Sequence, residues 1–126
     1  MKIKSFVVLL ALGLSACSGG KYAGVPKEYH ELLNQTMVTA GDNAKELTKA
    51  LKKAPADQKE GVAFLISYMP ERDAKTLTAD FLLENVSYAY KARAEFPWAK
   101  EVPNDIFLND VVAYVNLNEN RENWRK

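Results

Sequence analysis

Apolar side chains recur every three or four residues through most of the chain after residue 25. This spacing puts them on one side of a helix and predicts about five helices, each buried along one face. Pro26 and Pro55 suit first helical positions, and Gly41-Asp42 is expected to end the first helix and cap the second. The inward stripes of the first three helices comprise Tyr29, Leu32, Leu33, Thr36, Met37 and Ala40; Ala44, Leu47, Ala50 and Leu51; and Val62, Leu65, Ile66 and Met69.

Two further helices are expected after a loop at residues 71–75. Thr76 or Thr78 suits the cap of the fourth helix, which is predicted to run to about Phe96. Pro103 begins the fifth helix, and residues 111–115 are the one stretch that could also be a strand. Helices joined by short loops predict an all-α fold, a small bundle over residues 26–126. The expected inward residues are Phe81, Leu82, Val86, Tyr88, Ala89, Ala92 and Phe96 in the fourth helix, and Ile106, Phe107, Leu108, Val111, Val112, Tyr114 and Val115 in the fifth.

The first 20 residues have a different pattern. Lys2 and Lys4 precede an apolar run over residues 5–14, and small residues follow, which is typical of a secretory signal peptide. A membrane-spanning helix needs about 20 apolar residues, so the run is too short to be one. Residues 14–17, Leu-Ser-Ala-Cys, resemble the bacterial lipobox, which implies cleavage before Cys17 and acylation of that cysteine. The alternative is an ordinary secretory signal with an incidental cysteine.

The lipobox resemblance divides the chain into three parts. Residues 1–16 are the predicted signal peptide, residues 17–25 the lipidated cysteine and a flexible tether, and residues 26–126 the helical domain. The predicted location is the cell envelope, with the protein held to a membrane by its N-terminal lipid. Ser18, rather than an aspartate, resembles the outer-membrane sorting pattern and favours a position facing the periplasm.

The net charge and the residue types present limit the functions that the chain could have. The mature chain of 110 residues carries 15 basic and 16 acidic side chains, which argues against nucleic-acid binding. His30 is the only histidine, and no metal-ligand spacing or phosphate-binding glycine loop accompanies it. With Cys17 acylated, no nucleophile and base stand out as a pair. We therefore expect no enzyme activity, no cofactor and no metal.

Two polar residues interrupt the apolar face of the fourth helix. Asn85 lies near the centre of that face and Arg93 near one edge. A structural interpretation has Asn85 donating to a carbonyl at a neighbouring helix end, while Arg93 extends to solvent or pairs with an acid. The functional alternative makes both of them ligand contacts.

The carboxyl-terminal part of the chain is rich in aromatic residues. Trp98, Phe107, Trp124 and Arg125 form the candidate interaction surface. Little sequence follows Trp124 to cover it, so an apolar patch is expected where the helices would meet a partner or a further domain.

Residues 60–126 also resemble a known family. The stretches 64–70, 81–89, 97–98, 107–111, 118–119 and 124–125 are similar to the helical amino-terminal region of bacterial transglutaminase-like lipoproteins. Residues 112–114 replace that family's Leu-Pro-Tyr-like element, so its proline is missing. The family's papain-like core, with its Cys-His-Asp triad, would follow this region, and no residue here corresponds to the triad.

The resemblance implies a lipid-anchored, non-catalytic module equivalent to that accessory region. The chain would then be a truncated member, a fragment or a helical module used alone, and a transglutaminase-like catalytic domain would be its partner. The alternative is a free-standing envelope lipoprotein that binds a periplasmic protein or a cell-wall component.

Overall fold

The computed structural model describes residues 20–115 and 119–123, which form helices and turns without a β-strand. The predicted all-α fold is confirmed. Short 3₁₀ turns lead into each of the first three helices. The helices are α1 (His30–Ala40), α2 (Ala44–Lys53), α3 (Lys59–Tyr68), α4 (Glu71–Ala74), α5 (Ala79–Glu95), α6 (Pro97–Lys100) and α7 (Asn104–Ile106).

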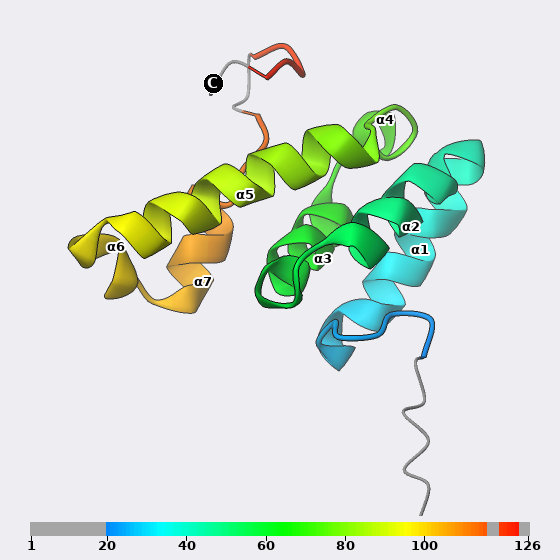
Figure 1. Cartoon of the computed structure of the whole chain (residues 1–126). Helices are drawn as coiled ribbons and strands as arrows, with labels where there is room; N and C mark the ends of the chain where they lie inside the picture. Colours follow the sequence, from blue (N-terminus) through cyan, green and yellow to red (C-terminus); the bar gives the residue numbers. More distant parts are fainter. Residues whose placement is uncertain (1–19, 116–118, 124–126) are drawn as a thin grey trace, which may run out of the picture.

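The longest helix, α5, joins two parts of the molecule (Figure 1). Helices α1, α2 and α3 pack against one another, and both α2 and α3 contact α5. The carboxyl-terminal part of α5 extends past these helices, with α6 at its tip and α7 beneath it (Figure 1). One continuous core runs through both parts, and its fully buried members include Leu33, Leu47, Val62, Ile66, Leu82, Val86 and Phe107.

Gly41 separates α1 from α2, as its position in the sequence predicts. Its φ of 56° lies in the left-handed region, which glycine adopts without the steric cost of a Cβ. The expected cap from Asp42 is wrong, because Asn43 holds the N-cap position of α2 and its side chain makes no capping bond. The Asn43 amide instead donates to the carbonyls of Ala74 and Leu77, 2.9 Å from each. It therefore ties this turn to the end of α4.

Thr78 caps α5, in agreement with the sequence. Its Oγ1 accepts from the backbone N–H of Phe81 at 3.2 Å. Glu46, on α2, accepts from the N–H of Ala79 at 2.9 Å, so a second side-chain oxygen, this one from a carboxylate, satisfies the same helix end. A carboxylate there also interacts favourably with the positive end of the helix dipole.

Gly61, on α3, lies against the Tyr90 ring of α5. A Cβ built on Gly61 would lie 2.7 Å from Cε2 of Tyr90, so the ring fills the space that a side chain would need. The same Tyr90 ring meets Phe107 edge to face, with ring centroids 5.0 Å apart. The absence of a side chain at Gly61 therefore allows the Tyr90 ring of α5 to pack against α3.

Residues 71–75, expected to be a loop, begin with the short helix α4. The extended backbone of Pro70 places its carbonyl where the N–H groups of Asp73 and Ala74 both donate to it, at 3.0 Å. Asp73 and Ala74 become buried as a result. The polar composition of this segment did not indicate that the turn faces the core.

The fifth helix is shorter and less regular than predicted. After α7, residues Phe107–Val111 form a π-helical turn in which the N–H of Val112 donates to the carbonyl of Phe107 at 2.9 Å. The extra residue in this turn lets Phe107 and Val112 both be buried, whereas Val111 is 39% exposed. A uniform period of 3.6 residues could not indicate this change of register.

The predicted tether at residues 17–25 is too long. Tyr22 and Val25 are both buried, and the Tyr22 hydroxyl donates to Oδ1 of Asn34 at 2.8 Å. Its ring also lies against His30, with centroids 5.3 Å apart. The folded domain therefore includes residues 22–25, because Tyr22 gains both an apolar surface and a hydrogen-bond partner there.

Candidate functional site

Of the candidate interaction surface, Trp98 lies at the corner between α5 and α6. Phe96 precedes a proline, which disfavours helical backbone, and its extended conformation ends α5. Pro97 then begins α6 at a position where no N–H is needed. The Phe96 carbonyl accepts from the N–H of Ala99 at 3.0 Å, so the corner is a fixed turn.

The corner exposes two stacked aromatic rings. Trp98 is 67% exposed and Phe96 is 47% exposed. Their ring centroids are 5.9 Å apart and the ring planes differ by 23°. The sequence predicted that the Phe96 side chain faces the core. This is wrong, because α5 ends at Phe96 and the chain turns at Pro97. We call Phe96 and Trp98 the aromatic pair.

Phe107 does not belong to this surface. It is only 1% exposed and packs against Tyr90 in the core. The guanidinium carbon of Arg93 lies 4.3 Å from the centre of the Phe107 ring and covers its outer face. The expectation of Phe107 as an interface residue is therefore corrected. Trp124 and Arg125 lie outside the described residues, as does Cys17.

Arg93 is held by neutral acceptors. Its guanidinium donates to the carbonyl of Val102 at 2.9 Å and to Oδ1 of Asn104 at 3.1 Å. These bonds fasten the loop before α7 to α5. Of the two interpretations of Arg93, the contacts support the structural one, although its partners are a carbonyl and an amide instead of an acid.

Asn85 is buried, as its position on the apolar face indicates. It is 3% exposed, and its Nδ2 donates to the carbonyl of Phe81 at 2.8 Å and to Oδ1 of Asn123 at 3.3 Å. Neither of these partners is the expected carbonyl at a neighbouring helix end, since Phe81 is one turn earlier in the same helix and Asn123 offers a side-chain oxygen. Asn123 in turn donates to Glu84. Asn85 thus helps to dock the carboxyl-terminal segment.

The strongest polar cluster is one that the sequence did not reveal. Asp73 is 1% exposed and accepts from the Tyr114 hydroxyl at 2.8 Å. It also accepts from Nε and Nη2 of Arg121, each at 3.0 Å, in a two-pronged ion pair. We call Asp73, Tyr114 and Arg121 the buried clamp. No periodicity links residues so far apart in the chain, and Asp73 appeared to belong to a polar loop.

The clamp alters the acidity of Tyr114 and Arg121. Burial, reinforced by the bond to Asp73, raises the pKa of the Tyr114 hydroxyl well above its usual value. The hydrogen bond to Asp73 raises the pKa of the Arg121 guanidinium. Tyr114 and Arg121 therefore stay protonated at neutral pH and keep donating to Asp73, which suits a structural role.

His30, the one histidine of the sequence, lies at the start of α1. His30 is half-buried, and its Nε2 lies 3.1 Å from the carbonyl of Val25. Across residues 20–115 and 119–123, no three His, Cys, Asp or Glu side chains gather as a metal site would require. Within the same residues, no helix is long and apolar enough to cross a membrane.

Comparison with protein-family models, curated proteins and solved structures found no match to this chain. The similarity to transglutaminase-like lipoproteins therefore stays a prediction from the residues that carry it.

Proposed function

We propose that this protein is a lipid-anchored, non-catalytic helical module of the bacterial cell envelope that holds a partner protein through the aromatic pair. One observation carries the proposal: Phe96 and Trp98 are stacked, exposed and fixed by Pro97 at the tip of α5. Lipidation of Cys17 would fasten the other end of the domain to a membrane.

The size of the exposed aromatic surface suits a binding anchor. An aromatic side chain presents about 150–250 Å² to a partner. Because Trp98 is 67% exposed, covering it would remove up to about 170 Å² from water, worth at most about 4 kcal/mol before the costs of association. Tryptophan is enriched among the few residues that dominate binding energy, and stacking on Phe96 limits the rotamer freedom that binding would remove.

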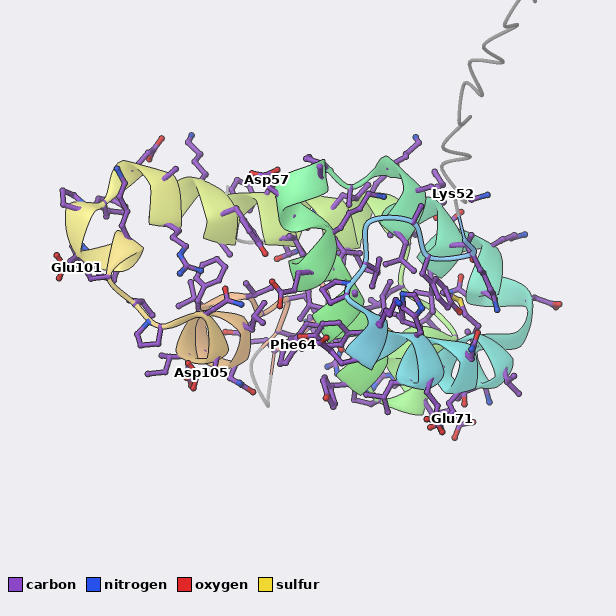
Figure 2. All side chains as sticks on the ribbon, turned by 90° about the horizontal axis from the view of Figure 1, so that it is seen from below. Lys52, Asp57, Phe64, Glu71, Glu101 and Asp105 are labelled. Carbon is purple, nitrogen blue, oxygen red and sulfur yellow. The ribbon has the colours of Figure 1, made fainter. Side chains whose placement is uncertain are left out.

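The position of the pair agrees with a role away from the membrane. Figure 2 labels Glu101, next to α6, at one end of the molecule and Lys52, on α2, near the other. Gly20, where the described chain begins, lines a cavity together with Lys52. A domain anchored through Cys17 would therefore present the aromatic pair at its remote end.

A second candidate function is the accessory region of a transglutaminase-like lipoprotein. Residues 97–98 belong to the stretches that carry that resemblance, and Trp98 is the exposed member. In this version the partner is a papain-like catalytic domain. The nucleotide sequence after codon 126 distinguishes the two: a continuing or frameshifted core with a cysteine motif supports the accessory region, and unrelated sequence supports a free-standing module.

Site-specific photo-crosslinking in cells tests the docking surface. A photoreactive phenylalanine analogue placed at position 98 should give one discrete adduct in the envelope fraction. Position 68 is the matched control, because Tyr68 is an aromatic residue of similar exposure, 61%, on α3. Equal adduct patterns from both positions, or no adduct from position 98, would contradict the proposal.

A further inference from the structure

Helix α2 concentrates positive charge on one side. Its ten residues include four lysines, Lys45, Lys49, Lys52 and Lys53, and one acid, Glu46. Steps of four, three and one residue keep the four lysines on neighbouring positions of one helix face. They line a common surface groove together with Thr48. We call these four residues the lysine face.

Few acids neutralise this face. Lys49 lies 3.8 Å from Glu46 and 3.9 Å from Asp80, both long contacts at the surface. The Glu46 oxygen near Lys49 also accepts from the backbone N–H of Ala79, so it is shared. Among the described residues, Lys45, Lys52 and Lys53 have no carboxylate within ion-pair distance. An excess of positive charge therefore faces outward.

The chain enters the domain beside the lysine face. Gly20, Tyr22 and Lys52 line one cavity of about 350 Å³. Burial of Tyr22 and its hydrogen bond to Asn34 fix this entry point on the domain. Cys17 precedes Gly20 by three residues, a span of at most about 11 Å even when fully extended.

We propose that the lysine face lies against anionic lipid headgroups of the membrane that carries the anchor. This inference rests on lipidation of Cys17, which would hold Gly20, and with it the Lys52 end of the face, within about 11 Å of the headgroups. Since about 11 Å is the longest reach of this segment, a shorter span brings the nearest lysines within the Debye length of about 8 Å at physiological salt, where the attraction to the headgroups is not screened out. Each lysine near an anionic surface strengthens binding about fivefold. The contact would fix the orientation of the domain and direct the aromatic pair away from the membrane.

The test attaches the mature chain, residues 17–126, to vesicles without relying on cellular lipidation. This chain contains every residue that the structure describes. Its single cysteine, Cys17, can be coupled to a maleimide lipid, in vesicles of phosphatidylcholine with or without phosphatidylglycerol. Acetylation of each lysine by a water-soluble reagent is then measured by mass spectrometry. Lys100, exposed on α6 at the far end, serves as the internal control.

We expect phosphatidylglycerol to slow acetylation of Lys45, Lys52 and Lys53 at least threefold at physiological salt. The acetylation rate of Lys100 should not change, and high salt should restore the rates of the other three lysines. Replacing all four lysines of the face by glutamine should abolish the salt-dependent binding of the chain, with Cys17 blocked, to the same vesicles. Equal acetylation on both vesicle types would overturn the proposal, and so would equal protection of Lys100. Because the coupling is chemical, either result is independent of whether Cys17 is lipidated in cells.

Discussion

Removing the buried carboxylate of the clamp is the most revealing perturbation of the fold. In Asp73→Ala the Tyr114 hydroxyl loses its acceptor at 2.8 Å, and Arg121 loses two bonds of 3.0 Å. The Arg121 side chain is 29% exposed, so water can rehydrate it in part, whereas Tyr114 is buried at 6% exposure.

The magnitude follows from these exposures. An unsatisfied buried hydroxyl costs about 1–3 kcal/mol, and breaking a fully buried ion pair costs about 3–5 kcal/mol. Since Arg121 keeps access to water, the ion-pair cost should fall near or below the lower limit. We expect Asp73→Ala to lower the free energy of unfolding by about 2–4 kcal/mol.

Urea unfolding followed by circular dichroism measures this loss. Asp80→Ala is the control, because the Asp80 side chain is 81% exposed and, among the described residues, its ion-pair partner is Lys49, at the long distance of 3.9 Å. It should change stability by less than about 0.5 kcal/mol. The double variant with Arg121→Ala should lose less than the two single variants added together, since both remove one ion pair. Equal small effects at positions 73 and 80, or strict additivity, would refute the buried clamp.

Three further predictions address other parts of the fold. Gly61→Ala should destabilise the fold by about 1–3 kcal/mol, because its Cβ would meet the Tyr90 ring at 2.7 Å. If Gly61→Ala costs as much stability in a Tyr90→Ala variant as in the wild type, the clash is refuted. Asn85→Ala should cost about 1–3 kcal/mol in thermal unfolding, and Lys91→Ala, on the exposed face, less than about 0.5 kcal/mol; equal losses would contradict the polar network. Tyr114 holds its proton to higher pH in the folded state than the value near 10 of an unfolded tyrosine, so stability should fall above about pH 10 by up to about 1.4 kcal/mol per pH unit. Tyr114→Phe should make that fall shallower, and an unchanged slope would rule out this source.

Local signals in the sequence identified the main helices. Gly41 and Thr78 act where their backbone and side-chain chemistry indicates, and Asn85 is buried because its neighbours on the helix are apolar. These features depend on residues within one or two turns. The pattern of the chain is therefore sufficient to predict them.

The errors arose where distant residues determine the outcome. Asp73 is buried because Arg121, 48 positions later, supplies its counter-charge, and no local pattern relates the two. Phe107 is covered by Arg93 and Tyr90, so an aromatic residue that suggested an interface belongs to the core. The exposure of Phe96 has a local cause instead, because the turn at the neighbouring Pro97 redirects the chain away from the helical face. Only the three-dimensional arrangement separates the aromatic pair from the core aromatics.

Metabolic labelling with palmitate tests the central proposal most directly, because every orientation argument begins at a lipid on Cys17. The wild-type chain should incorporate the label and fractionate with membranes, and Cys17→Ser should do neither. Equal labelling of the two proteins, or an unlabelled wild-type chain in the soluble fraction, would contradict the proposal of a lipid-anchored module.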